Sequence, residues 1–298
     1  MTEENKAGDT RVPARVFAQA RDEAKAAEKS AVHTLQTQSP AYKLAFQDMD
    51  FLLRQDLRPV RFQLELLKPE LLLDEARIGS MFVFYGSARI PEPSKAQALL
   101  ELATDEKAKR IAERLVAKAK YYDEARKLAQ LCSNFPRDTE GNRHFVVCSG
   151  GGPSIMEAAN RGAQDVHAES VGLNIVLPHE QAPNEYVTPS LSFQFHYFAL
   201  RKMHFLLRAR AVAVFPGGFG TFDETFELLT LIQTGKVEPI PVLFFGREFW
   251  ERVVNFEALC EEGVVSERDL DLFHFCESAE EGWAIVQDFY RDRPKPVI

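Results

Sequence analysis

The 298-residue sequence has few cysteines, no long hydrophobic run and no excess of positive charge. Its four cysteines are scattered without a CxxC pair, so neither a disulfide framework nor a metal site is expected. The longest uninterrupted apolar stretches, such as Met81–Tyr85, are far shorter than the roughly 20 residues of a membrane helix. The 36 Lys and Arg against 44 Asp and Glu leave a net charge of -8, which argues against nucleic acid as the main partner.

Targeting and cofactor motifs are also missing. The first residues include Glu3 and Glu4 and no apolar segment, so no secretion signal is expected, and a cytoplasmic protein without a membrane partner is predicted. Neither GxGxxG nor GxxxxGK[ST] occurs, which removes the common NAD and ATP fingerprints.

The sequence divides into four segments that differ in composition and in the spacing of their hydrophobic residues. Residues 1–38 are rich in alanine and charge and predict a mobile or loosely helical tail. Residues 39–78 carry leucines at helical spacing and predict a helical lead-in packed on the main domain. Residues 79–291 alternate short apolar runs with helical stretches, and residues 292–298 form a short C-terminal tail.

The apolar runs of the main segment predict the strands of a parallel sheet. They are too continuous for strands with one solvated face, so we expect a Rossmann-like, doubly wound α/β sheet with helices on both faces and a helical N-terminal extension. Phe193–Met203 is interpreted as the approach and first turns of a helix. The predicted strands are Met81–Tyr85, Phe145–Cys148, Val171–Leu177, Ala211–Phe215, Val242–Phe245 and Leu272–Phe275.

Small-residue loops follow three of these strands, at the edge where such sheets bind ligands. They are Gly86-Ser87-Ala88-Arg89, Ser149-Gly150-Gly151-Gly152-Pro153-Ser154 and Pro216-Gly217-Gly218-Phe219-Gly220-Thr221. Glycine backbones and a helix start together hold phosphate, so the second and third loops are interpreted as anion-binding sites.

Two carboxylates have a plainer interpretation. Thr221-x-x-Glu224 and Ser154-x-x-Glu157 both have the spacing of a capping box, which spacing alone favours over catalysis. The aromatic residues between Phe193 and Phe198 are interpreted as core, and Arg201 with Lys202 as a basic helix face that begins near the binding edge.

Arg201-Lys202 followed by Pro216–Glu224 resembles the paired signature of the LOG family, the cytokinin riboside 5′-monophosphate phosphoribohydrolases, over roughly Gly79–Tyr290. Where the family usually has His-Glu-Arg-Lys, this sequence has Ala199-Leu200-Arg201-Lys202. The first 78 residues and a long helical segment at 91–143 are additional to the family's short form. That segment could cover the site or extend a subunit interface, but its charged helical stretch around Lys107–Leu131 is interpreted first as a solvated crossover helix.

The resemblance implies hydrolysis of a nucleoside 5′-monophosphate, AMP or a cytokinin riboside monophosphate, by a homodimer or higher homo-oligomer without metal or cofactor. By motif position, Arg201 and Glu224 are the catalytic pair, with Glu157 a secondary candidate. The residues implied to bind phosphate or nucleotide are Gly86, Ser87, Gly151, Gly152, Lys202, Gly217, Gly218, Gly220 and Thr221. The alternative is a carrier, similar to molybdenum cofactor carrier proteins, that holds a phosphorylated ligand without cleaving it.

Overall fold

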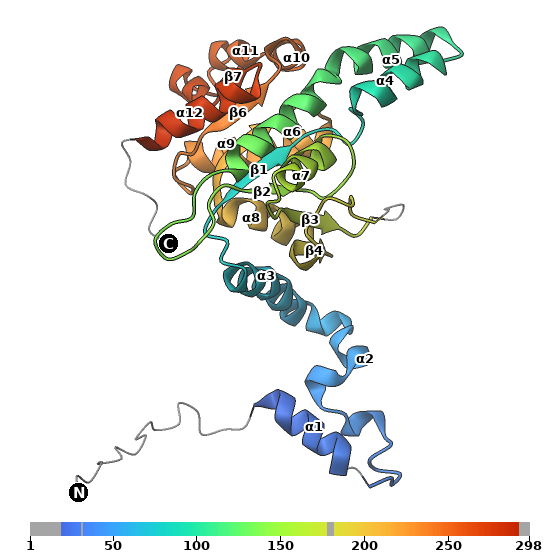
Figure 1. The fold of residues 1–298 in the computed structure, drawn as a ribbon. Coiled ribbons are helices and arrows are strands. Elements are labelled where there is room, and N and C mark those ends of the chain that lie inside the picture. Colours follow the sequence, from blue (N-terminus) through green and yellow to red (C-terminus); the bar gives the residue numbers. More distant parts are fainter. Residues whose placement is uncertain (1–18, 31, 178–181, 292–298) are drawn as a thin grey trace, which may run out of the picture. The chain divides into compact units, whose positions relative to one another are not determined.

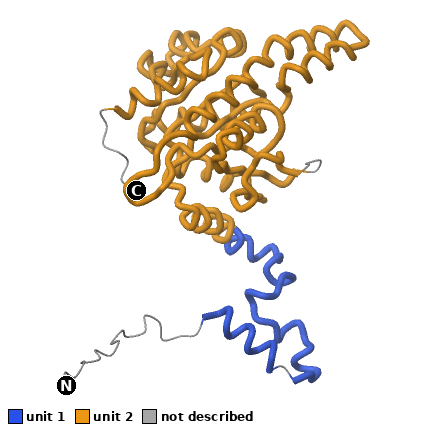
Figure 2. Tube along the Cα trace, viewed as in Figure 1, with its two compact units in different colours: residues 1–61 blue, residues 62–298 orange. Residues whose placement is uncertain are grey.

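The computed structural model describes residues 19–30, 32–177 and 182–291. It divides the chain into two compact units, Met1–Arg61 and Phe62–Ile298 (Figure 2). The first 18 residues of the predicted N-terminal tail and the predicted C-terminal tail at 292–298 lie outside the described residues.

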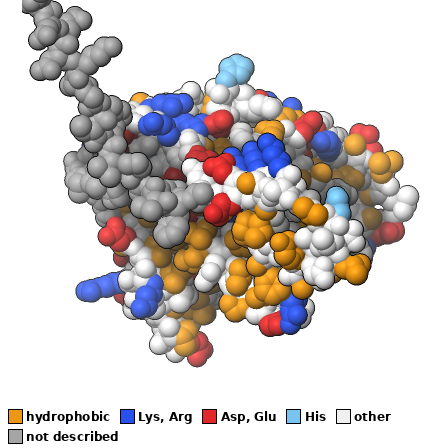
Figure 3. Space-filling view, turned by 90° about the horizontal axis from the view of Figure 1, so that it is seen from below, with side chains coloured by type: hydrophobic (Ala, Val, Ile, Leu, Met, Phe, Trp, Pro, Cys, Tyr) orange, Lys and Arg blue, Asp and Glu red, His pale blue; other side chains and the backbone are white. Residues whose placement is uncertain are grey.

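Unit 1 consists of short helical pieces with little buried surface. Its helices are α1 (Ala20–Ser30), α2 (Met49–Leu52), three 3₁₀ turns (Pro40–Tyr42, Ala45–Gln47 and Gln55–Leu57) and the start of α3 (Arg58–Glu75). Among the described residues of this unit only Ala24 is buried. Large hydrophobic side chains such as Phe46 and Met49 are exposed. Figure 3 shows hydrophobic side chains of the chain as a whole, in orange, on the face seen from below.

Unit 2 contains a seven-stranded parallel sheet in the order β4-β3-β2-β1-β5-β6-β7, which confirms the predicted α/β fold class (Figure 1). The strands are β1 (Met81–Tyr85), β2 (Val146–Ser149), β3 (Val171–Ile175), β4 (Ser192–Phe195), β5 (Ala209–Val214), β6 (Val242–Phe245) and β7 (His274–Cys276).

The edge strand β4 is a correction to the sequence interpretation, which assigned its residues to the approach of a helix. Ser192–Phe195 pairs with β3 and buries Phe193 and Phe195, while Gln194 between them is exposed. This alternation is that of a strand covered on one face only, so the segment lacks the continuous apolar run by which the central strands are found.

Helices cover both faces of the sheet, because successive side chains of each strand point to opposite sides. Met81, Val83 and Tyr85 of β1 belong to one core cluster, whereas Phe82 and Phe84 belong to the other. The first cluster includes residues of α3, α8 (Phe198–Leu207), α9 (Phe219–Gln233), α10 (Arg247–Val253) and α11 (Phe256–Glu261). The second includes residues of α6 (Lys120–Ser133), α7 (Ile155–Asp165) and α12 (Ala279–Arg291).

The segment between β1 and β2 contains two kinds of helix. α4 (Pro93–Glu101) and α5 (Glu106–Lys118) lie together and extend away from the sheet in Figure 1, with a single buried residue in each. α6 instead buries six side chains, among them Tyr121 and Tyr122, against the sheet. The single solvated crossover helix predicted here is therefore wrong for α6, since a parallel sheet needs its crossover helix as a cover.

The strand order creates a switch point between β1 and β5. The chain runs outward from β1 through β2 and β3 to β4, and then returns to place β5 on the other side of β1. Loops that leave β1 and β5 therefore diverge and open a crevice at the carboxyl edge of the sheet, where open α/β sheets bind ligands. No described helix has both the length and the apolar character that a membrane span requires.

Candidate functional site

A cavity of about 760 Å³ lies at this switch point. It is lined by the turn after β1, the start of α9 and side chains from α7, α8 and α10. The lining residues are Gly86, Ser87, Ala88, Arg89, Met156, Arg201, Gly218, Phe219, Gly220, Thr221, Phe222, Glu224 and Val253. Seven of the twelve residues predicted from the sequence thus line one cavity.

Arg201 and Glu224 face each other in this cavity. The Arg201 Nη1 lies 3.5 Å from the Glu224 Oε1, and the two side chains are only 12% and 15% exposed. Arg201 also donates from Nε to the Leu173 carbonyl oxygen at 2.7 Å, and its guanidinium carbon lies 5.1 Å from the centre of the Phe205 ring. The guanidinium is therefore held in one orientation by neighbours outside the cavity.

Burial raises the pKa of Glu224 to about 7, even though the positive charges of Arg201 and Lys202 act in the opposite direction. Asp223 and Glu227 add like charge and contribute to the increase. A carboxyl group that titrates near neutral pH can exist in both protonation states under ordinary conditions, which is a property of catalytic acids and bases.

The capping interpretation of Glu224 is wrong. α9 begins at Phe219 with Gly218 as its N-cap and no side-chain cap, so Thr221 lies in the first turn and Glu224 in the second. Thr221 is buried. Its carbonyl oxygen accepts a hydrogen bond from the Thr225 hydroxyl at 2.6 Å. The Glu224 carboxylate has no role at the helix start and lines the cavity instead.

The start of α9 opens onto the cavity. The first backbone N–H groups of a helix have no partner within it, and the helix dipole places partial positive charge there. A Cβ on Gly218 or Gly220 would meet no atom within 4 Å, so both glycines border open space. Gly217 differs, because a Cβ there would lie 2.2 Å from the Thr221 Oγ1; this glycine permits the close packing of the loop.

The turn after β1 is tied to its neighbours by backbone contacts. Ser87 donates from its N–H to the Pro216 carbonyl oxygen at 3.2 Å, and its own carbonyl accepts from the Ile155 N–H at 3.4 Å. A Cβ on Gly86 would lie 2.5 Å from the Ile155 Cγ2. The absence of a side chain at Gly86 therefore lets β1 and α7 approach.

The Gly150–Gly152 loop supports the site without lining it. A Cβ on Gly150 would lie 2.6 Å from the Arg201 Nη2, so this glycine leaves the room that the guanidinium occupies. Gly151 has a φ of +72°, and a Cβ there would lie 2.6 Å from the Asn174 Nδ2. The space next to Gly152 is filled by Met156, whose Cε would be 2.6 Å from a Cβ. Gly151 and Gly152 are therefore not among the cavity residues.

Two predicted side chains make other contacts. The Lys202 Nζ lies 3.0 Å from the Asp223 Oδ1 and 2.9 Å from the Glu227 Oε2, and these two carboxylates raise the lysine's pKa although burial lowers it. Glu157 accepts a hydrogen bond from the Tyr122 hydroxyl at 2.7 Å, and Ser154 makes no side-chain cap at the start of α7. Neither Lys202 nor Glu157 lines the cavity.

Six cavity residues were not among the predicted site residues: Ala88, Arg89, Met156, Phe219, Phe222 and Val253. Arg89 belongs to the same turn as Gly86 and Ser87, so its place directly after a predicted strand was an available signal. Its backbone N–H donates to the Ser87 Oγ at 3.0 Å, while its side chain is exposed. Phe219 is 96% exposed at the first position of α9, which no apolar pattern predicts.

Comparisons with known proteins agree with the motif. Residues 156–286 match the model of a family described as "Possible lysine decarboxylase", which covers LOG-like proteins. The resemblance predicted from Arg201 and the Pro216–Glu224 motif is thus confirmed for this segment. No curated protein matches the chain significantly.

Several solved structures are similar to parts of the chain at low sequence identity. The molybdenum cofactor carrier protein of Chlamydomonas reinhardtii is 19% identical over 58% of this chain and 89% of its own, with a TM-score of 0.39. The molybdenum cofactor binding protein of the phototrophic bacterium Rippkaea orientalis is 19% identical over 57% of this chain and 87% of its own, with a TM-score of 0.39. The structure of TM1055 is 20% identical over 70% of this chain and 99% of its own, with a TM-score of 0.44.

Proposed function

We propose that this protein hydrolyses the N-glycosidic bond of a nucleoside 5′-monophosphate and releases the free base and ribose 5-phosphate. The observation that carries the proposal is the buried pair of Arg201 and Glu224, 3.5 Å apart, in the same cavity as the open start of α9. The pair supplies a group for the reacting carbon, and the helix start supplies a site for the phosphate.

The 5′-phosphate is assigned to the start of α9. Gly218 and Gly220 leave the backbone accessible there, and the unpaired N–H groups of the first turn would donate to phosphate oxygens. Arg89, an exposed residue, lines the same cavity and adds positive charge near it. A phosphate held in this way orients the ribose, so nucleosides without phosphate are expected to react poorly.

Glu224 is assigned to the reaction at C1′. When the bond from C1′ to the base nitrogen breaks, positive charge develops on the ribose, and the ionised Glu224 stabilises it as carboxylates do in glycoside hydrolysis. A water molecule then bonds to C1′ through its oxygen and gives a proton to Glu224. The leaving base takes up a proton from solvent, and Glu224 returns its proton to solvent before the next turnover. Arg201 favours the ionised form of Glu224 and positions it.

The residues of the cavity do not suit lysine decarboxylation. That chemistry uses pyridoxal phosphate on a Schiff-base lysine. None of the described residues lining the cavity is a lysine, and nearby Lys202 is paired with Asp223 and Glu227. The family description is therefore a poor guide to the reaction of this chain.

The test is chromatographic detection of free base after incubation with AMP, other nucleoside monophosphates and isopentenyladenosine monophosphate. Matching nucleosides without phosphate, the Glu224→Gln variant and a Glu238→Gln control serve as comparisons, since Glu238 is exposed in the loop after α9. Release from monophosphates only, lost in Glu224→Gln and retained in Glu238→Gln, supports the proposal. Tight binding of a monophosphate without release from any of them would favour a carrier instead.

A further inference from the structure

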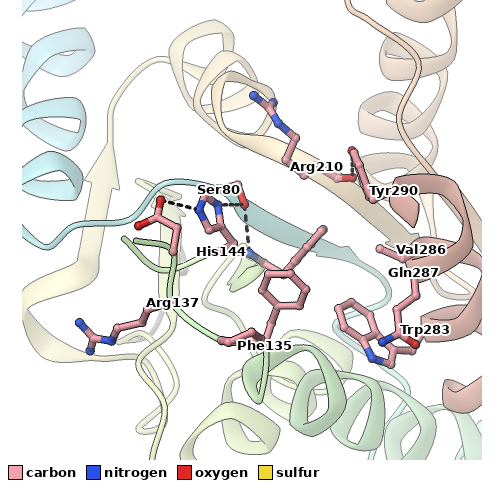
Figure 4. Close-up of a pocket in the computed structure, with 12 residues that line it drawn as sticks. Ser80, Phe135, Arg137, His144, Arg210, Trp283, Val286, Gln287 and Tyr290 are labelled. Carbon is pink, nitrogen blue, oxygen red and sulfur yellow. Dashed lines mark hydrogen bonds and ion pairs between the residues drawn. The ribbon is translucent and has the colours of Figure 1, made fainter. Parts of the chain in front are cut away.

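A second cavity, of about 280 Å³, lies at the opposite edge of the sheet from the candidate active site. Its walls come from the residues that precede β1 and β2, from the segment after α6, from β5 and from α12. Figure 4 shows Trp283, Val286 and Gln287 of α12 on one side and Ser80 with His144 on the other. None of these residues takes part in the function proposed above.

Aromatic rings form one part of this cavity. The ring centres of Phe135 and Phe145 are 4.9 Å apart, and Trp283 lies 5.5 Å from Phe145 and 6.2 Å from Phe135, all edge to face. These rings pack against each other on the cavity wall, so their positions are fixed by the fold. Such an arrangement offers ring faces and edges to a planar apolar group.

His144 forms the polar part. Its Nδ1 lies 3.1 Å from the Ser80 Oγ and its Nε2 lies 3.1 Å from the Asp138 Oδ2, so the three side chains are in the order of a catalytic triad. Ser80 is only 1% exposed. Its hydroxyl oxygen also accepts a hydrogen bond from the Phe145 N–H at 3.0 Å. A nucleophile needs an accessible oxygen, so this trio serves as a rigid wall rather than as a catalytic group.

The charges around the cavity favour an anion. Among the described residues, Arg137 donates only to the Gly141 carbonyl oxygen at 3.4 Å and Arg210 only to the Ala209 carbonyl oxygen at 3.0 Å, and no carboxylate of that set pairs with either. Both residues line the cavity, and their side chains extend outward from it in Figure 4, away from Trp283.

The acidic residues nearby are already engaged. Asp138 accepts a hydrogen bond from the Asn142 N–H and makes another with His144. These hydrogen bonds lower the pKa of Asp138, and the bond with His144 has the larger effect. In the adjoining hollow, which shares Phe135, Arg137 and His144, Glu169 is paired with Arg143. Within the part of the chain that the structure describes, the cavity is thus lined by two arginines that no carboxylate neutralises, in a chain of net charge -8.

We propose that this cavity binds a small aromatic anion, such as a one- or two-ring carboxylate. The ring would lie against Phe135, Phe145 and Trp283, and the acid group would face Arg137 and Arg210. The volume is close to the lower limit of about 300 Å³ for ligand pockets, which suits a small ligand. The site is separate from the candidate active site, so the proposal does not depend on the reaction catalysed there.

Isothermal titration of the full-length chain with 2-naphthoate tests the proposal, with 2-naphthamide as a neutral probe of nearly the same shape. We expect naphthoate to bind at least about tenfold more tightly, because only it can pair with the two arginines. Equal affinities for the two probes, or no binding of naphthoate, would overturn the assignment of an aromatic anion.

Matched variants locate the binding. Gln287 is exposed on α12 at the cavity, whereas Ala284 is exposed on the same helix away from it. Gln287→Trp should block naphthoate binding, and Ala284→Trp should leave it unchanged. Arg137→Ala and Arg210→Ala should each weaken naphthoate several-fold and naphthamide little, while Arg268→Ala, at an exposed position elsewhere, should change neither. Binding that survives Gln287→Trp would place the probe elsewhere and refute the proposal.

Discussion

Replacement of Glu224 by glutamine is predicted to stabilise the folded protein at alkaline pH while it abolishes turnover. Burial raises the pKa of Glu224 from the ordinary 4.5 to about 7 despite the neighbouring Arg201. The folded state therefore holds the ionised carboxylate at a cost in free energy that the neutral amide avoids. At about 1.4 kcal/mol per pKa unit, this cost is about 3 kcal/mol.

The pH dependence has a definite sign. A folded-state pKa above the unfolded one means that the folded protein binds the proton more tightly. The resulting stabilisation of the wild type is fully present below pH 4.5 and is lost as the pH rises through about 7. Glutamine does not titrate, so the variant should exceed the wild type by less than about 1 kcal/mol near pH 5 and by about 3 kcal/mol near pH 8.

Urea unfolding followed by tryptophan fluorescence measures this difference. Both tryptophans, Trp250 and Trp283, lie in unit 2, so the signal reports the unit that contains Glu224. A fixed protein concentration keeps any association constant between samples. Glu238→Gln, at an exposed position, should show no comparable gain. If Glu224→Gln were destabilised near pH 8, or gained equally at both pH values, the reasoning from burial would be refuted.

Three further outcomes are expected. The value of kcat/KM should decrease as the pH is lowered through about 7, because only ionised Glu224 is active. A phosphate monoester ionises at about pH 6, so ribose 5-phosphate binding is measured over the same pH range as a control. A kinetic profile that merely follows this binding would contradict the assignment of the titrating group to Glu224. Arg201→Lys keeps the positive charge but loses the hydrogen bond from Nε to the Leu173 carbonyl oxygen, so kcat should fall at least about tenfold with a smaller change in KM. Unchanged steady-state kinetics would contradict the positioning role of Arg201. Gly217→Ala should lower the free energy of unfolding by about 1–3 kcal/mol, because the added Cβ clashes with Thr221. Gly220→Ala should not lower it, because a Cβ there meets no protein atom within 4 Å. Equal thermal unfolding of the two variants would contradict the packing argument.

The sheet and the position of Arg201 and Glu224 at its carboxyl edge were predictable because their signals are local. The central strands are buried on both faces and appear as continuous apolar runs, and the loops after β1 and β5 meet wherever those strands are neighbours. The edge strand β4 lacks such a run because only one of its faces is buried. The homodimer, the cytoplasmic location and the domain boundaries stay predictions.

The remaining candidate residues depend on contacts that a sequence does not display. A glycine in a sequence indicates that a side chain would not fit there, but it does not show whether a ligand or the protein itself fills the space. The space beside Gly151 is filled by Asn174, and the space beside Gly152 is filled by Met156. Lys202 follows Arg201 directly, yet consecutive helical residues point in different directions, so Lys202 meets Asp223 and Glu227 instead of the cavity. Its pairing depends on the packing of α8 beside α9.

Quantification of both products from AMP tests the proposed reaction most directly. Adenine is measured by chromatography and ribose 5-phosphate by phosphorus NMR, for the wild type and for Glu224→Gln. We predict that the wild type forms the two products in equal amounts and that Glu224→Gln forms neither while it still binds ribose 5-phosphate, because the start of α9 is unchanged. Unaltered AMP after incubation with the wild type, or undiminished product from Glu224→Gln, would contradict the proposed role of Glu224.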